Sequence, residues 1–418
     1  MQPECYITRA RDWKSGALLH GAVTRLKDIL GHKCFMRRIR RSRDFASNVQ
    51  SLWRYPSAAR DAATAVSLHS HTMHSKESLD FIPRVLAKIP AIAHRVHRIS
   101  ERRRAASGHG IAFERGFWRP PLHAQAAWEL EAGQIRNTLR LEPLVSITDH
   151  DDLEACADLQ AIGIPAPYSL EWTVPYGPTI FHIGVHNLPA EQARGFAAEM
   201  ARYTVAPEPH LLATLLAELD ALPDVLVVLN HPFCCELRVD RAGHIPWLRQ
   251  FLQQHLSRLH ALELNGLQPA SDNREVIRLA EENGIPTVSG GDRHCLEPNA
   301  NVNLTNATTF AEFVNEVRRE RLSRVLFLPQ YREPIAARYI EFIWHAARNY
   351  PELPGRKRWV DRIFYDHERD GVVPLAAFWP EGGPWALRYF IAAVGFLATP
   401  HMRATLRLAF GEQGQVGA

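Results

Sequence analysis

The chain has 418 residues, of which 46% are hydrophobic and 22% are charged, and its formal net charge is +4. This balance excludes a chain that is disordered throughout, and it allows a substantial hydrophobic core. Residues 1–60 carry thirteen Lys/Arg against four Asp/Glu, so the basic character belongs to the front of the chain and not to its main body.

The cysteines and the first residues indicate the compartment. None of the six cysteines forms a Cys-x-x-Cys pair, and a chain of this length does not need disulfides to fold, so we expect a reducing cytoplasm. Arg9 and Lys14 interrupt any early apolar run, which argues against a secretory signal. The most membrane-like stretch, 389–400, is shorter than the roughly 20 apolar residues of a spanning helix, so we expect no transmembrane segment.

Residues 1–60 are predicted to form a basic, partly helical N-terminal extension. Apolar residues between positions 16 and 30 recur on one helical face, and five arginines follow between positions 37 and 43. Such a cluster is either a solvated surface run or an arm for nucleic acid or anionic lipid.

Short apolar runs that stop at a histidine or an acid recur along the chain. They are residues 66–68 before His69 and His71, 144–148 before Asp149 and His150, 168–170 before Glu171, 179–181 before His182, 225–229 before Asn230 and His231, and 286–288 shortly before Asp292 and His294. Each run is typical of a buried strand. Strands that each end in a coordinating side chain favour a parallel barrel, whose chemistry lies at the carboxyl ends of its strands.

A long insertion, about residues 78–142, separates the first two of these strands. Apolar residues from 82 to 99 recur at helical spacing, and arginines continue to position 104. The insertion is either a lid whose arginines meet an anionic substrate or a plain surface helix.

From residue 153 onward short strands alternate with helices, which predicts an α/β sheet within a main domain of residues 61–330. Two helix starts have the spacing of a capping box: Asp272 with Glu275, and Thr309 with Glu312.

Residues 331–418 are predicted to form a helical, aromatic-rich C-terminal appendage that packs on the barrel or on another subunit, so an oligomer through this segment is one expectation. Core packing is the ordinary explanation for its tryptophans and phenylalanines. Contact of the last helix with a membrane interface is the alternative.

The candidate metal ligands are imidazoles and carboxylates, a donor set that favours zinc, manganese or iron over a cysteine-type structural zinc. They are His69, His71, Glu77, His150, Glu171, His182, His231, Asp292 and His294. They are too many for one tetrahedral ion, so we expect two or three divalent ions. Such ions activate water and neutralise phosphoryl oxygens, which makes a phosphate ester the natural substrate.

The order of these motifs resembles the PHP (polymerase and histidinol phosphatase) superfamily over roughly residues 64–330. The matching motifs are His69-x-His71, Asp149-His150, Glu171, His182, Asn230-His231-Pro232 and Asp292-x-His294. The resemblance implies a distorted seven-stranded (β/α) barrel with a trinuclear metal centre, in an enzyme that hydrolyses phosphomonoesters or nucleic-acid phosphodiesters.

The resemblance also implies which residues share an ion. One ion would be held by His69, His71, Glu171 and Asp292, a second by Glu171, His182 and His231, and a third by His150 and His294. The family often has an aspartate after the first motif, where this chain has Ser75-Lys76-Glu77, so Glu77 is assigned to the third ion instead.

Further residues are expected to serve catalysis or substrate binding. The catalytic set is Asp149, which would orient an imidazole, the bridging Glu171, and Arg293. Arg293 either grips the phosphate or makes an outward salt bridge. His186 either replaces His182 or faces the pocket, and His74 either contacts substrate or is solvated. Asn230 and Asn265 either support ligands or cap turns.

The expected function is hydrolysis of a small phosphomonoester or nucleotide by metal-bound hydroxide. A phosphodiesterase or exonuclease is the alternative if residues 1–60 bind nucleic acid. A module that keeps metals for stability without catalysis is the alternative from another class.

Overall fold

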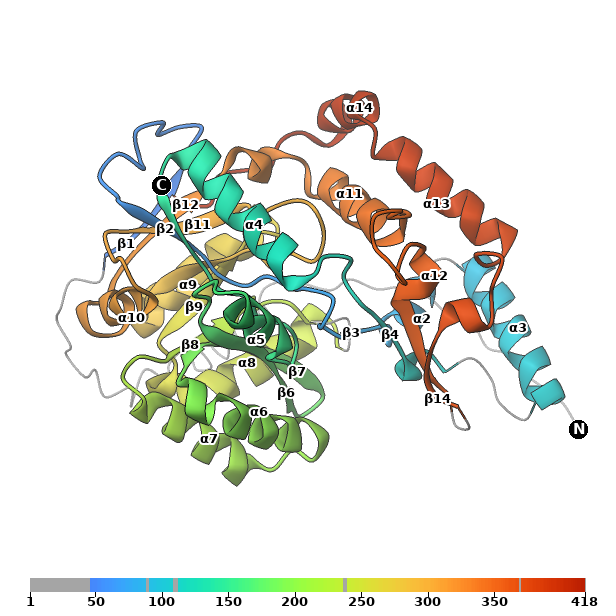
Figure 1. Ribbon diagram of the computed structural model, residues 1–418, viewed down its shortest axis with the longest axis horizontal. Coiled ribbons are helices and arrows are strands. Elements are labelled where there is room, and N and C mark those ends of the chain that lie inside the picture. The colour runs from blue at the N-terminus through green and yellow to red at the C-terminus, as the bar shows by residue number, and fades with distance from the viewer. Residues whose placement is uncertain (1–45, 88–89, 108–111, 236–238, 368–369, 418) are drawn as a thin grey trace, which may run out of the picture. The chain divides into compact units, whose positions relative to one another are not determined.

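The computed structural model describes residues 46–87, 90–107, 112–235, 239–367 and 370–417 (Figure 1). The chain divides into two units, Met1–Asp44 and Phe45–Ala418, and the second is described below. The expected helix at 16–30 and the arginine cluster at 37–43 lie outside the described residues.

The fold is mixed α/β, with two five-stranded sheets and a smaller third one. The first sheet has the order β1 (Ala46–Ser51), β12 (Leu322–Phe327), β11 (Asn301–Thr305), β2 (Thr64–Ser67) and β5 (Glu142–Val145). The second has the order β10 (Thr287–Gly290), β9 (Ala261–Asn265), β8 (Leu226–Asn230), β7 (Thr179–Leu188) and β6 (Tyr168–Tyr176). β1 belongs to the predicted N-terminal extension, yet it pairs in parallel with β12.

The predicted seven-stranded barrel is not confirmed, because these strands form two sheets and not one closed ring. Two isolated parallel bridges link the ends of the sheets, Ser70 with Arg293 and His150 with Glu171. Both bridges involve residues of the candidate site or their neighbours.

The expectation of a parallel barrel is wrong at β11, which is antiparallel to β2 and β12. It is also wrong at β7, which is antiparallel to both β6 and β8. The physical reason is the two-residue connection between β6 and β7, which contains Gly177 with φ 60°. Parallel neighbours need a crossover of a dozen or more residues, so a link this short requires a hairpin. β8, β9 and β10 are parallel and are joined through helices, as predicted.

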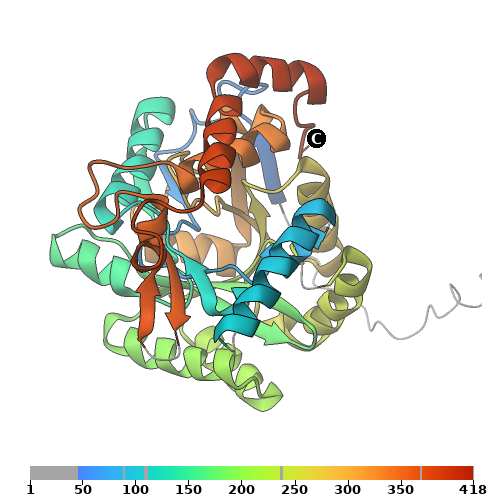
Figure 2. The same cartoon turned by 90° about the vertical axis from the view of Figure 1, so that its right-hand side faces the viewer.

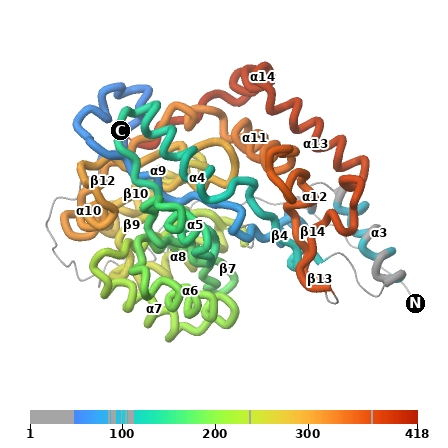
Figure 3. Tube along the Cα trace, viewed as in Figure 1, coloured from blue at the N-terminus to red at the C-terminus, as the bar shows by residue number. Residues whose placement is uncertain are grey.

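Helices pack around these two sheets (Figures 1 and 3). They are α4 (Ala124–Gln134), α5 (Glu154–Ala161), α6 (Ala190–Val205), α7 (Pro209–Ala221), α8 (Arg241–His255), α9 (Ala270–Asn283) and α10 (Phe310–Asn315). The largest core cluster joins the second sheet to its helices, and Trp172 and Phe251 are fully buried in it.

One of the two predicted capping boxes is confirmed. The Thr309 hydroxyl accepts from the Glu312 N–H, and the Glu312 carboxylate accepts from the Thr309 N–H. Asp272 is not an N-cap, because α9 already begins at Ala270. Its carboxylate lies 3.0 Å from an Arg241 nitrogen, and Glu275 binds the same guanidinium.

The insertion and the C-terminal segment share the third sheet. Its order is β14 (Gly371–Pro374), β13 (Ile363–His367), β4 (Gly116–Trp118) and β3 (Glu77–Ser78). Figures 1 and 2 show this sheet beside helices of both segments. The helices of these two segments are α2 (Ile82–Ala87), α3 (Pro90–Ser107), α11 (Ile335–Ala347), α12 (Trp359–Arg362), α13 (Trp385–Leu397) and α14 (Pro400–Phe410). Of these, α14 lies away from the sheet and packs against α11 and α13. The C-terminal segment is therefore not wholly helical, and its strand β13 pairs with the insertion.

Core packing does not explain all the aromatic residues of this segment. Phe364 stacks on Phe117 of β4 with ring centroids 5.4 Å apart. Trp385, Tyr389 and Phe396 of α13, in contrast, are 68%, 71% and 63% exposed. None of the helices in the described ranges is long and apolar enough to cross a membrane.

Candidate metal centre

The candidate ligands come from the ends of several strands. His69 and His71 follow β2, His231 follows β8, and Asp292 and His294 follow β10. His150 lies five residues beyond β5, whereas Glu77 opens β3 and Glu171 lies within β6. His182 lies near the start of β7, which differs from the expected strand end. Because β7 runs antiparallel to β8, His182 is nevertheless paired with Asn230, the last residue of β8.

All nine candidate ligands lie in four overlapping groups. The groups are His71, Glu77, His150 and His294; His69, His71 and Asp292; His69, Glu171 and His231; and His150, Glu171 and His182. Within each group the donor atoms lie within 4.8 Å of one another. These groups could hold metal ions.

The distances between donors fit shared cations. Four donors placed tetrahedrally around an ion at ~2.1 Å lie about 3.4 Å from one another. Asp292 Oδ1 is 3.5 Å from His71 Nε2, and His294 Nε2 is 3.2 Å from Glu77 Oε2. An uncompensated cluster of buried carboxylates and imidazoles at such spacing needs protons or metal ions to balance its charge.

Glu171 lies at the middle of the cluster and is fully buried. Its Oε1 is 3.1 Å from His231 Nε2 and 3.4 Å from His182 Nδ1. Its Oε2 is 3.0 Å from His69 Nε2 and 3.5 Å from His150 Nε2. The two oxygens therefore face different pairs of imidazoles, and each pair has one histidine from each of the two groups that contain Glu171.

Glu77 also lies in the cluster. Its Oε2 lies 3.3 Å from His150 Nε2, and its Oε1 accepts from the Ser75 hydroxyl at 2.6 Å. Pairing of β3 with β4 places Glu77 opposite Trp118. The third sheet thus delivers one candidate ligand.

The backbone is strained at three candidate ligands. His69, His231 and Asp292 have φ values of 64°, 28° and 53°. This region is costly for residues other than glycine, and such strain is concentrated at functional sites.

Charge is strongly coupled in this cluster. Burial alone would raise the pKa of Glu171, but the positive charge of His69 and its neighbours lowers that pKa well below its ordinary value. Burial would lower the pKa of His150, but Glu77 and Glu171 raise it to about 10. Carboxylates and imidazoles thus hold one another charged, and metal ions binding there would displace protons from the rings.

Asp149 and Arg293, which were expected to serve catalysis, contact other residues than predicted. Asp149 accepts from the Thr72 N–H at 2.5 Å and from its hydroxyl at 2.6 Å, so it holds the loop after His71 and not an imidazole. Arg293 points inward and is 3% exposed. Its Nε donates to the buried Glu131 at 2.7 Å, so the outward salt bridge is wrong, and a contact with phosphate stays a prediction.

The two histidines expected to bind substrate lie outside the four groups. His74 Nε2 is 3.1 Å from an Asp158 carboxylate oxygen. His186 is buried, and its Nδ1 lies 2.9 Å from the Ser146 hydroxyl. Burial lowers the pKa of His186 to about 3, so the ring is neutral.

Sequence reasoning missed Glu263, a buried acid on β9. Its Oε2 lies 2.9 Å from His69 Nδ1, and its Oε1 accepts from Asn265 Nδ2 at 2.7 Å. The signal was a single acid in the apolar run Ala-Leu-Glu-Leu of residues 261–264. Asn230 also supports the cluster, because its Nδ2 donates to Glu171 Oε1 at 2.9 Å.

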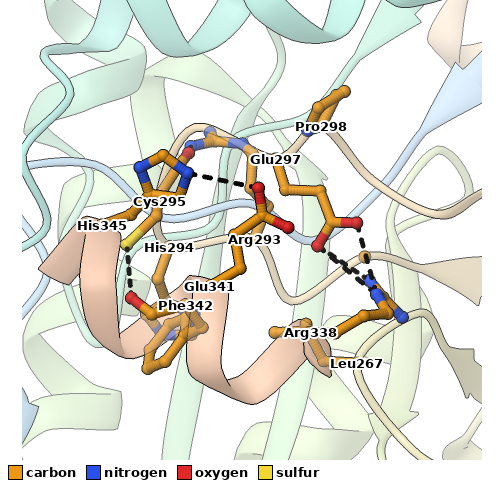
Figure 4. Close-up of a pocket in the computed structure, with 11 residues that line it drawn as sticks. Leu267, Arg293, His294, Cys295, Glu297, Pro298, Arg338, Glu341, Phe342 and His345 are labelled. Carbon is orange, nitrogen blue, oxygen red and sulfur yellow. Dashed lines mark hydrogen bonds and ion pairs between the residues drawn. The ribbon is translucent and has the colours of Figure 1, made fainter. Parts of the chain in front are cut away.

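A small cavity lies beside His294 (Figure 4). Arg338 and Glu297 form an ion pair at its wall, and Phe342 and His345 come from α11. Its volume of about 20 Å³ is enough for a single water molecule.

The comparisons with known proteins do not assign this chain to a family. No protein family and no curated protein matches the sequence. A solved structure from Bifidobacterium adolescentis, named as a candidate metal-dependent phosphoesterase, has a TM-score of 0.29 and 15% identity, over 47% of this chain and 91% of its own. An amidohydrolase from Chromobacterium violaceum has a TM-score of 0.26 and 18% identity, over 42% of this chain and 83% of its own. Structural likeness this weak does not indicate a function.

Proposed function

We propose that this chain is a metal-dependent phosphoesterase of the PHP type that acts on a small phosphomonoester or nucleotide. The observation that carries the proposal is the meeting of nine nitrogen and oxygen donors in four overlapping groups. Their order along the sequence is also the order of the PHP motifs. A donor set of imidazoles and carboxylates without thiolates suits catalytic zinc, manganese or iron.

The donor groups indicate which residues would hold ions. Glu77, His71, His150 and His294 would hold one ion at the third sheet. Glu171 would bridge further ions held with His69, His182, His231 and Asp292. Bound there, the ions would activate water near neutral pH and stabilise charge on the phosphoryl oxygens.

Other residues of the chain would keep this geometry in place. Asp149 holds Thr72 and therefore the loop that carries His71. Asn230 donates to Glu171 and fixes the direction of its carboxylate. Arg293, held by Glu131, anchors the loop between Asp292 and His294.

Hydrolysis by the full-length protein tests the proposal. Metal-free protein is reloaded separately with zinc, manganese or iron and assayed on an aryl phosphate, a panel of phosphomonoesters and nucleotides, and a phosphodiester. We expect metal-dependent release of phosphate from a monoester, and a loss of at least about 100-fold for His231→Ala. His255→Gln is the matched control, because His255 is buried outside the four groups.

Two results would contradict the proposal. Preference for the phosphodiester would favour a phosphodiesterase or exonuclease. Metal uptake without turnover of any ester would favour a non-catalytic metal-binding module.

A further inference from the structure

His69 faces a carboxylate on each side of its ring. Its Nε2 lies 3.0 Å from Glu171 Oε2 and 3.1 Å from His71 Nε2, toward the candidate metal centre. Its Nδ1 lies 2.9 Å from Glu263 Oε2, away from the centre. A neutral imidazole carries its proton on one nitrogen and a lone pair on the other. A carboxylate at Nδ1 holds the proton there and leaves the Nε2 lone pair for an ion.

The surroundings fix Glu263 in this position. Asn265 Nδ2 donates to Glu263 Oε1 at 2.7 Å and to Asp292 Oδ2 at 3.3 Å. The orientation of the Asn265 amide is set, because its Oδ1 accepts from the Leu267 N–H at 2.7 Å. Both oxygens of the Glu263 carboxylate therefore have partners within the protein, as a residue that is only 1% exposed requires.

The neighbouring strand leaves space for this carboxylate. β10 pairs with β9, and its Gly290 lies where an added Cβ would be 2.1 Å from the Glu263 carboxyl carbon. Any residue larger than glycine at position 290 would displace the Glu263 carboxylate from His69 Nδ1.

We propose that Glu263 is a positioning residue of the metal centre, which fixes the tautomer and direction of His69. This inference rests on the proposed function. Its effect is confined to the ions that His69 helps to hold. The group of His71, Glu77, His150 and His294 does not contain His69 and keeps its ion without Glu263.

The isosteric substitution Glu263→Gln tests this role. A glutamine can accept with one end only, whereas Asn265 and His69 Nδ1 both donate to this side chain. If its amide nitrogen faces His69, the ring must move its proton to Nε2 and lose the lone pair. If that nitrogen faces Asn265, two donors meet. The first arrangement removes coordination through Nε2. The second weakens it, because the two facing donors displace the side chain and a neutral amide makes the ring a weaker ligand than a carboxylate does.

The measurement is a zinc titration of the metal-free, full-length protein against a chromophoric chelator. We expect Glu263→Gln to lower the zinc affinity about 10- to 100-fold at the class of site that contains His69. The zinc affinity of the other class, which does not contain His69, should stay the same. Asn265→Ser removes the donor to Glu263 Oε1 and should give a smaller loss at the class that contains His69. If Glu263→Gln does not fold, the zinc affinity of Asn265→Ser tests the role of Glu263 instead.

Asp220→Asn is the matched control. Asp220 Oδ1 lies 3.0 Å from His260 Nε2, so this variant also disturbs a carboxylate–imidazole contact, but outside the four groups. Its zinc affinity should equal that of the wild type. Unchanged affinity in Glu263→Gln, or equal loss at both classes, overturns the role of Glu263. A wild-type protein that takes up no zinc overturns both this inference and the proposed function.

Discussion

The pKa values of histidines in this chain are shifted in two opposite directions. In the candidate centre, carboxylates raise the pKa of His69 and His150 despite burial. His260 lies outside it, and burial lowers its pKa to about 4, although Asp220 opposes the shift. Its Nδ1 accepts from the Val227 N–H at 2.8 Å, which requires a lone pair there. In the metal-free protein, the same residue type is thus charged at one place and neutral at another.

His260 should make the fold sensitive to acid. The unfolded chain binds a proton at His260 below pH 6.5, whereas the folded chain resists it until about pH 4. The contribution of His260 to the free energy of unfolding is therefore fully present above pH 6.5. It decreases as the pH falls toward 4, by at most about 3 kcal/mol. We expect His260→Asn, which keeps an acceptor for Val227, to lose less free energy of unfolding than the wild type between pH 7 and pH 4. Urea unfolding of both metal-free proteins measures the difference, and equal losses would contradict the assignment.

Among the elements, the hairpin of β6 and β7 explains why His182, contrary to the prediction, does not end a strand, and why it still lies beside the other candidate ligands. His182 was chosen as a ligand at a strand end, but β7 continues through it to Leu188. The short turn at Gly177 reverses the chain, and the reversal brings His182 to the level of Asn230. Local residue patterns show that strands exist, but strand direction depends on the connection between them. The Gly177-Pro178 turn was the available signal.

Helix α13 presents an apolar face that no described element covers. Trp385, Tyr389 and Phe396 lie on one side of the helix, and all three are well exposed. Exposed apolar patches of this kind are typical of interaction sites. The expectation that residues 331–418 mediate an oligomer stays a prediction, and α13 is where we would place the contact.

Self-association through α13 should depend on these aromatic residues. We expect a concentration-dependent increase in sedimentation coefficient for the wild type, and a loss of that increase in the double variant Tyr389→Ser, Phe396→Ser. Stability should change by less than about 0.5 kcal/mol, because both side chains are exposed. Val205→Ser is the control, an exposed apolar residue on α6. A wild type that is monomeric at every concentration, or that binds lipid vesicles instead, would contradict self-association through this face.

At the scale of the whole molecule, the sequence predicted which donor residues lie close together better than it predicted the arrangement of the strands. The nine donors could be chosen from the sequence, because each lies in a short motif of residue types that bind metal ions. Sheet pairing depends on contacts between distant segments, which motifs do not record. The partnership of β4 with β13, more than 240 residues later, is one such contact. Glu263 was missed for a related reason: its partner His69 lies 194 residues away.

The central claim is that one buried cluster, bridged by Glu171, holds several ions. The most direct test is the metal content of the full-length protein after loading with zinc and removal of free ion, measured by mass spectrometry for the wild type and Glu171→Gln. We predict two or three ions per chain in the wild type and at least one fewer in the variant. A wild type that retains no zinc, or a variant that retains as much as the wild type, would contradict the claim.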